Sequence, residues 1–271
     1  MDKTVTQLSQ IHSSPIGRAT IGDQLRRHAL NVPRREALVQ YGPGGTRRSL
    51  TYAQLNNDAN RVAHAFTEFG VERGDVVAVM SPNAVETIVS YYGALKLGAA
   101  YTGINVMYGT EELRYQLEHA DPKVVVVASS VWKAVEPLRQ SRPGTTFVLL
   151  EPDLLEPDEA VEGWHRWDDV LDGRPSSEPD VDVDENDIAL ISYTSGTEAN
   201  PKGVMIPHRN YLISTTPSYS VGFRITPEDV WLFVMPFFTI AGIGTATTLT
   251  LIGATIVLPS SLESGAALKT I

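Results

Sequence analysis

The chain has 271 residues, of which 42% are hydrophobic and 20% are charged, and it contains no cysteine. These proportions are typical of a folded globular protein, and they exclude disulfide scaffolds, thiolate metal sites and cysteine nucleophiles. The net charge of −10 argues against a nucleic-acid partner, because nucleic acids bind to basic surfaces. The absence of cysteine and of an apolar N-terminal run indicates a cytoplasmic protein without a secretory signal.

One uncharged stretch, residues 230–262, is long enough to cross a bilayer. Pro236 and three glycines interrupt it, however, and it holds five threonines between Thr239 and Thr250, a composition more typical of buried strands, turns and a helix. We therefore predict no transmembrane segment.

Strand-like and helix-like patterns alternate in chain order. The predicted strands cover residues 36–41, 75–80, 99–105, 123–128, 145–150, 188–193, 230–234 and 254–258. The predicted helices cover residues 52–69, 83–97, 110–119 and 131–139, a segment near Asn210 and a segment after Gly242, with Thr51 and Thr110 as N-caps. Continuous Val, Ile and Ala runs between helices predict an α/β fold with doubly wound, mainly parallel sheets covered by helices.

The chain is predicted to divide into two α/β lobes. Residues 1–173 form the first lobe, and residues 188–271 begin a second lobe that is incomplete. Residues 174–187 are acidic, contain proline and have almost no apolar content, so we interpret them as a solvated linker rather than a metal or ligand site.

The segment that is most informative about function is residues 193–204, with the sequence Tyr-Thr-Ser-Gly-Thr-Glu-Ala-Asn-Pro-Lys-Gly-Val. We predict a phosphate-binding loop between a buried strand and a helix, at the carboxyl edge of a parallel sheet. Its hydroxyls and glycine amides can donate to anionic oxygens, and its lysine supplies a positive charge. The candidate ligands of ATP are Thr194, Ser195, Gly196, Thr197 and Lys202. From composition alone, an ordinary turn remains an open interpretation.

This loop resembles the signature of the adenylate-forming superfamily, Tyr-Thr-Ser-Gly-Thr-x-x-x-Pro-Lys-Gly-Val, and matches it at every fixed position. Glu198 and Ala199 stand where Thr and Gly are more usual. The resemblance extends from about residue 20 to the end, through residues 50–55, 70–75, 94–101 and 104–113. Asn105 is more similar to the CoA ligases than to peptide-synthetase domains, which favour aspartate there.

The resemblance implies an acyl-CoA synthetase that uses ATP, Mg²⁺ and CoA to activate a small carboxylic acid. In such enzymes an acyl-adenylate forms first and a thioester with CoA forms second. The resemblance also suggests an acyl pocket at Phe237, Phe238, Thr239 and Gly242, although core packing remains equally open for the two phenylalanines. Thr239 stands where many relatives have a histidine. His208 matches a frequent family histidine, for which we favour a structural role.

The family's adenine-site Thr-Glu pair, ribose aspartate, hinge and late lysine lie beyond the position that matches Ile271. We therefore expect a fragment that is catalytically impaired alone, with its catalytic residues outside this chain. Two alternatives remain: a non-catalytic nucleotide-binding or interaction module, and a nicotinamide-dependent oxidoreductase, which would lack its Gly-x-Gly-x-x-Gly fingerprint. The sequence leaves the carboxylic acid and the oligomeric state open.

Overall fold

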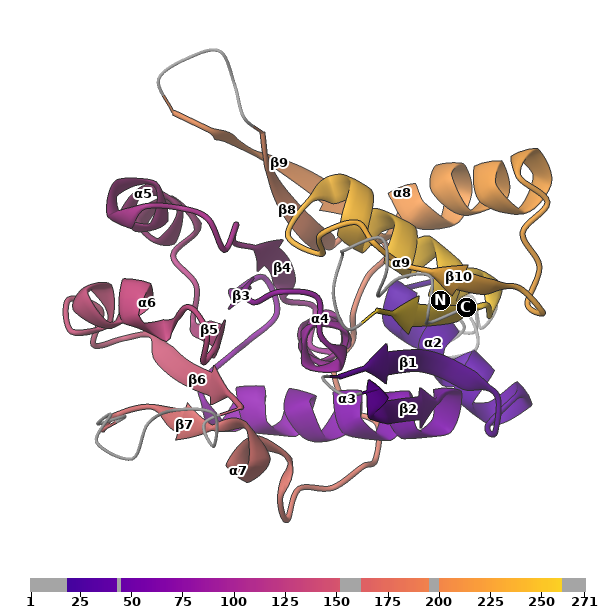
Figure 1. Cartoon of the computed structure of the whole chain (residues 1–271), viewed down its shortest axis with the longest axis horizontal. Coiled ribbons are helices and arrows are strands. Elements are labelled where there is room, and N and C mark those ends of the chain that lie inside the picture. The colour runs from indigo at the N-terminus through magenta and orange to yellow at the C-terminus, as the bar shows by residue number, and fades with distance from the viewer. Residues whose placement is uncertain (1–18, 43–44, 152–161, 195–199, 260–271) are drawn as a thin grey trace, which may run out of the picture.

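The computed structural model describes residues 19–42, 45–151, 162–194 and 200–259 (Figure 1). The strands are β1 (Glu36–Tyr41), β2 (Arg47–Thr51), β3 (Val76–Met80), β4 (Ala100–Gly103), β5 (Val124–Ala128), β6 (Thr146–Leu150), β7 (His165–Arg166), β8 (Ile188–Thr194), β9 (Lys202–Pro207), β10 (Val230–Leu232) and β11 (Thr255–Leu258). The helices are α2 (Ile21–Asn31), α3 (Tyr52–Glu68), α4 (Val85–Lys96), α5 (Thr110–Ala120), α6 (Trp132–Arg139), α7 (Trp167–Leu171), α8 (His208–Asn210), the π-helical η3 (Tyr211–Thr215) and η4 (Ser218–Gly222), and α9 (Ile240–Ile252).

Within these residues the strands form a seven-stranded sheet, ordered β7-β6-β5-β3-β4-β8-β9, and a four-stranded sheet, ordered β10-β11-β1-β2. Neighbouring strands run parallel except in the pairs β8–β9 and β1–β2. Alternate valines of β5 enter two different core clusters, because successive side chains of a strand point to opposite faces. The predicted α/β fold with mainly parallel, doubly covered sheets is thus confirmed.

Helix α4 lies between the two sheets (Figure 1), and each of its residues is buried. It packs against β3 and β4 of the larger sheet and against β1 of the smaller one. A helix buried on all sides must be apolar on all sides or must satisfy its polar groups internally. Because α4 contacts both sheets, its position sets how the two sheets lie relative to each other.

The uncharged stretch forms β10, α9 and β11, as predicted. Helix α9 has 13 residues, and none of the helices in the described ranges is long and apolar enough to span a membrane. Its C-cap Gly253 has φ of 98°, a left-handed conformation that favours glycine.

The prediction that residues 193–204 connect a strand to a helix is wrong. Residues from Lys202 onward form β9, which pairs antiparallel with β8 from Ile188↔Pro207 to Thr194↔Lys202. Gly203 and two prolines suggested a loop, but the apolar residues between Gly203 and Pro207 extend the edge of the sheet. The next helix begins only at His208.

One of the two predicted helix caps is confirmed. The Thr51 hydroxyl accepts from the Gln54 amide while the Gln54 side chain accepts from the Thr51 amide, which is a capping box. Thr110 is instead the first residue of α5, and Gly109 occupies the cap position without a side-chain hydrogen bond. Glu111 and Glu112 in the first turn complement the helix dipole there.

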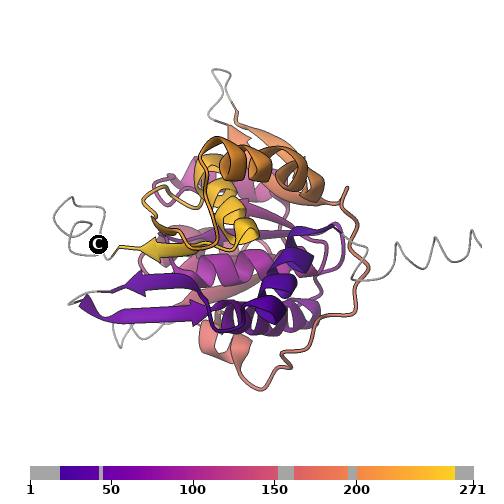
Figure 2. The same cartoon turned by 90° about the vertical axis from the view of Figure 1, so that its right-hand side faces the viewer.

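Residues 174–187 run along one side of the molecule from α7 to β8, in the salmon-coloured part of Figure 2. Both sheets contain strands from before and after this segment, and the division into two lobes stays a prediction. The segment is not uniformly solvated, since Val183 is buried and Glu178 reaches the core.

The buried ammonium of Lys96 lies 2.6 Å from the Glu178 carboxylate and 2.9 Å from the Asn56 side-chain oxygen. Its side chain is 3% exposed. Burial lowers the pKa of Lys96, against the attraction of Glu178. Burial alone would raise the pKa of Glu178, but the charge of Lys96 and hydrogen bonds from Lys96, Asn56 and Asn60 together lower it. This ion pair attaches the 174–187 segment to α4.

We predict that Glu178→Ala lowers the free energy of unfolding by about 3 kcal/mol, because Lys96 would keep its buried charge without a counter-ion. Asp180→Ala, in the same segment but exposed, is the matched control and should change stability by less than about 0.5 kcal/mol. Urea denaturation of both variants measures the difference. Equal effects of the two substitutions would show that the pair does not anchor the segment.

His208 begins α8 and is fully buried, and its Nδ1 accepts a hydrogen bond from the Ile21 amide at 3.3 Å. Within the described residues its Nε2 has no hydrogen-bond partner. Burial lowers the pKa of His208 to about 4, although Asp187, Asp23 and Asp184 pull it upward. These contacts favour the structural role that we predicted for this residue.

We expect neutral His208 to make stability depend on pH. Its folded pKa of about 4 lies below the ordinary value of 6.5, so the unfolded chain takes up the proton first as pH falls. The stabilising contribution is complete above pH 6.5 and decreases by up to about 3 kcal/mol as pH falls toward 4. Urea denaturation of the wild type and of His208→Gln across this range measures it, and parallel pH profiles would contradict it.

Candidate nucleotide-binding site

The end of the β8–β9 hairpin brings two predicted ATP ligands together. Thr194 is the last residue of β8, Lys202 is the first of β9, and the two residues pair directly. Directly opposed residues of an antiparallel pair project from the same face of the sheet. Both residues are exposed, so a hydroxyl and an ammonium lie side by side where a ligand can reach them. The other three predicted ligands, Ser195, Gly196 and Thr197, lie outside the described residues.

Gly203 permits a close contact within this hairpin. A β-carbon placed on Gly203 would lie 3.0 Å from a methyl carbon of Ile191 and 3.4 Å from the Tyr193 ring. The tyrosine side chain therefore packs over the glycine backbone, and this packing fixes the strand next to Lys202.

A second predicted segment, residues 237–242, approaches the same edge of the larger sheet. A β-carbon on Gly103, at the carboxyl end of β4, would lie only 2.5 Å from the Phe238 Cα. Since β4 is also the strand next to β8, the hairpin and the 237–242 segment converge on one sheet edge. The carboxyl edge of a parallel sheet is where α/β proteins commonly bind ligands.

The residues predicted to line an acyl pocket take different places there. Phe237 is fully buried and its ring centroid lies 4.9 Å from that of Phe233, which makes it a core residue. Phe238 is half-buried. The Thr239 hydroxyl caps α9, because it accepts from the Gly242 amide at 3.0 Å and donates to the Pro236 carbonyl at 2.8 Å. The Thr239 hydroxyl, at the position where many relatives carry a histidine, is thus used in the cap of α9.

Gly242 has a steric reason to be glycine. A β-carbon there would lie 1.8 Å from the Pro236 carbonyl oxygen, a distance that no side chain can adopt. The turn from Pro236 to Gly242 is therefore tightly closed at the start of α9.

Asn83 is a positioning residue for this turn that the sequence prediction missed. Its side-chain nitrogen donates to the Met235 carbonyl and its side-chain oxygen accepts from the Phe237 amide, each at 2.8 Å. The only local signal is a polar residue just after the end of β3, and the prediction placed it inside a helix.

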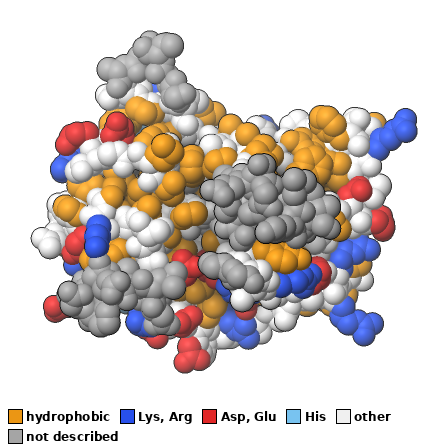
Figure 3. Space-filling view, viewed as in Figure 1, with side chains coloured by type: hydrophobic (Ala, Val, Ile, Leu, Met, Phe, Trp, Pro, Cys, Tyr) orange, Lys and Arg blue, Asp and Glu red, His pale blue; other side chains and the backbone are white. Residues whose placement is uncertain are grey.

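Hydrophobic side chains gather across the upper half of the face shown in Figure 3. Large hydrophobic residues that are at least 46% exposed include Met107, Val204, Met205, Val234 and Ile240. They belong to β9, to the segments that follow β4 and β10, and to the first residue of α9. Val204 and Met205 thus give the hairpin exposed apolar side chains.

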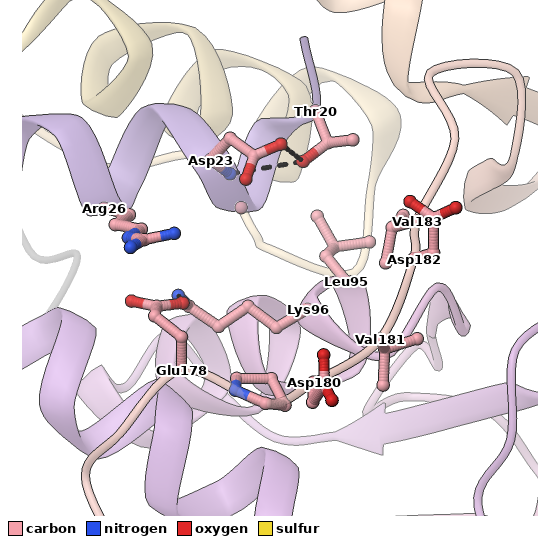
Figure 4. Close-up of a pocket in the computed structure, with 12 residues that line it drawn as sticks. Thr20, Asp23, Arg26, Leu95, Lys96, Glu178, Asp180, Val181, Asp182 and Val183 are labelled. Atoms are coloured by element: carbon pink, nitrogen blue, oxygen red, sulfur yellow. Dashed lines mark hydrogen bonds and ion pairs between the residues drawn. The ribbon is translucent and has the colours of Figure 1, made fainter. Parts of the chain in front are cut away.

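A partly open cavity of about 430 Å³ lies elsewhere, among the start of α2, the end of α4 and residues 178–183 (Figure 4). Asp23, Arg26, Lys96 and Glu178 line it, so both signs of charge are present. None of the predicted site residues contributes to its wall. Four carboxylates line it, against the two cations of Arg26 and Lys96, and the Lys96 charge is paired with Glu178, so the lining disfavours a polyanion such as ATP.

Comparisons with known proteins identify the family of the chain. A family model described as AMP-binding enzyme matches residues 25–271. The chain is 32% identical over 239 residues to the long-chain-fatty-acid–CoA ligase FadD13 of Mycobacterium tuberculosis. This match covers 88% of the chain and 44% of FadD13. The chain thus spans less than half the length of this relative.

Two solved structures are similar over most of the chain. One is the inhibitor-bound N-terminal domain of FACL13 from Mycobacterium tuberculosis, with a TM-score of 0.80 and 30% identity, covering 93% of this chain and 60% of that one. The other is the anthranilate CoA ligase AuaEII in complex with anthranoyl-AMP, with a TM-score of 0.81 and 26% identity, covering 93% and 47%. Because the family model matches nearly the whole chain, this protein belongs to the AMP-binding enzymes of the adenylate-forming superfamily.

Proposed function

We propose that this chain supplies the phosphate-binding part of an ATP-dependent acid–CoA ligase of the cytoplasm. The observation that carries the proposal is the pairing of Thr194 with Lys202 at the exposed end of the β8–β9 hairpin. The similarity to a ligase solved with an acyl-AMP supports the nucleotide chemistry.

The proposed reaction has two steps. A carboxylate oxygen of the acid attacks the α-phosphorus of ATP, the bond to the bridging oxygen of the β-phosphate breaks, and pyrophosphate leaves. The sulfur of CoA then attacks the acyl carbon, the thiol proton goes to solvent, and AMP leaves with the electron pair of the acyl–oxygen bond. The carboxylate is already ionised at neutral pH, so the first step needs no general base.

The main obstacle is electrostatic, since an anion must approach a polyanion. The Lys202 ammonium and the Thr194 hydroxyl would hold the β- and γ-phosphates, and we propose that Ser195, Gly196 and Thr197 donate to the same oxygens. Positive charge and fixed donors stabilise the departing pyrophosphate and keep the attack in line.

Mg²⁺ fits this scheme as a partner of the phosphates. Within the described residues no group of three or more His, Asp or Glu side chains could hold a metal ion. Magnesium commonly binds through substrate phosphates and one or two carboxylates and keeps several waters. When bound it would neutralise phosphate charge, while this chain's own residues position the phosphates.

We propose that residues 237–242 contribute one wall of the acyl pocket. Phe238 and Gly242 are the candidate contacts, Phe237 supports them from the core, and Thr239 fixes the turn through its cap. The nearby exposed apolar side chains favour an acid with an apolar body.

The second candidate is a module that binds nucleotide without turnover. It is supported by the described part of the site, since Thr194 and Lys202 account for phosphate binding alone. Both candidates require ATP at the hairpin, and they differ only in the chemistry that follows. For either one we expect the chain to bind ATP through Thr194 and Lys202.

We predict that Lys202→Ala weakens MgATP binding roughly 10- to 100-fold, because a hydrogen bond to a charged group is lost. Lys123→Ala is the matched control, since this exposed lysine precedes β5 at the opposite edge of the sheet and should leave affinity unchanged. Titration calorimetry of the three proteins measures the dissociation constants. Equal affinities for Lys202→Ala and the wild type would exclude the hairpin as the phosphate site.

Release of pyrophosphate separates the two candidates. The chain is incubated with MgATP, CoA and a panel of aliphatic and aromatic carboxylic acids. Acid-dependent pyrophosphate release above the level of Lys202→Ala indicates the ligase. MgATP binding without such release indicates the module.

A further inference from the structure

Helix α5 holds the hairpin end from one side (Figure 1). The Tyr115 hydroxyl donates to the Pro201 carbonyl at 2.9 Å, and His119 Nδ1 lies 2.7 Å from the Tyr193 hydroxyl. Tyr115 and His119 are four residues apart and therefore share one face of the helix. Their rings stack at 5.6 Å, and the Tyr193 ring meets His119 edge-on at the same distance.

These contacts reach both strands of the hairpin immediately before the proposed phosphate ligands. Tyr193 precedes Thr194, and Pro201 precedes Lys202. A shift of either strand would therefore move a phosphate ligand by a similar amount. In a site that depends on position, a misplacement of about 1 Å can cost roughly 100-fold in rate.

The hairpin needs this support because its neighbour in the sheet ends early. Strand β8 pairs with β4 at Tyr101↔Leu190, and the Thr102 hydroxyl continues the contact with a hydrogen bond of 2.9 Å to the Ile191 carbonyl. Beyond that point, within the described residues, the strand partner of β8 is β9 alone. Side chains of α5 supply the contact that the short β4 does not.

The tautomer of His119 decides which partner donates in its hydrogen bond with Tyr193. Burial, together with the neighbouring Tyr115, raises the pKa of Tyr193 to about 12, so its hydroxyl is protonated at neutral pH. The hydroxyl donates when Nδ1 of His119 carries no proton, and it accepts when Nδ1 is protonated.

Helix α5 is itself fixed to the sheet. The buried Gln116 side chain donates to the Gly103 carbonyl at 3.0 Å and to the Thr102 hydroxyl at 3.2 Å. Leu113 and Leu117 are buried in the cluster on that face of the sheet. A helix held in this way can act as a rigid reference for the hairpin.

We propose that Tyr115 and His119 are positioning residues for the nucleotide site, which fix the hairpin end so that Thr194 and Lys202 meet the phosphates of ATP. This inference rests on the proposed function. It assigns no contact with ATP to α5 itself.

Three variants of α5 test the inference. Tyr115→Phe removes one hydroxyl and keeps the ring, and His119→Phe removes the ring nitrogen and keeps an aromatic side chain. His119→Asn restores an acceptor near the position of Nδ1. Glu118→Gln, an exposed change on the same helix, is the control.

Two readouts are measured at a temperature far below the unfolding midpoint. The first is the MgATP dissociation constant, which should rise roughly 2- to 10-fold in Tyr115→Phe and in His119→Phe, as expected for one lost hydrogen bond. The second is deuterium exchange of the backbone amides of β9, which should be faster in both variants. His119→Asn should recover most of both properties, and the control should match the wild type.

Unchanged amide exchange in β9 and an unchanged dissociation constant in both phenylalanine variants would overturn the inference. Faster exchange with unchanged affinity would also overturn it, because the helix would then stabilise the hairpin without positioning its ligands. Absence of MgATP binding by the wild type would refute the proposed nucleotide site instead. In that case, faster β9 exchange that His119→Asn reverses would still support the role of α5 in fixing the hairpin, and unchanged exchange would reject it.

Discussion

The complete burial of α4 between the two sheets is the constraint on which the rest of the structure depends. Neighbouring elements provide partners for several of its polar side chains, while within the described residues the hydroxyls of Thr87 and Ser90 have none. The Thr247 hydroxyl of α9 donates to the Tyr91 hydroxyl at 2.8 Å, and the hydroxyls of Thr250 and Tyr92 are also hydrogen-bonded. Lys96, at the end of α4, pairs with Glu178. Through these contacts α4 holds α9 and the 174–187 segment in place.

This arrangement determines where the candidate site lies. The turn that starts α9 is brought to the end of β4, where Gly103 leaves room for the backbone of Phe238. Strand β8 joins the larger sheet beside β4, which places the hairpin at the same edge. The hairpin and the proposed acyl wall thus converge because β4 pairs with β8 and its end contacts the backbone of Phe238.

The local features of the sequence predicted much of this fold. Valine-rich runs marked β3 and β5, Thr51 marked the start of α3, and the hydroxyl-rich segment at Thr194 marked the end of β8. Strand β9 was missed because glycine and proline near Lys202 are typical of loops, whereas the pairing with β8 depends on neighbours that the local pattern does not contain.

The sequence could not predict the contacts that support the site, because they join residues far apart in the chain. Asn83 bonds to a segment more than 150 positions later, His119 to Tyr193 across 74 positions, and Lys96 to Glu178 across 82. No spacing rule links such pairs, so only the fold reveals them. Thr239 illustrates the same limit, since its hydroxyl is used by the cap of α9 rather than left for a substrate.

The central claim is that ATP binds at the hairpin end and not in the charged cavity beside α2. Amide chemical shifts of the isotope-labelled chain, recorded while MgATP is added, test this most directly. We expect the amides of Thr194, Lys202 and Gly203 to shift, while those of Asp23 and Lys96 stay unchanged. Shifts confined to Asp23, Lys96 and their neighbours would contradict the account and place the nucleotide in the cavity.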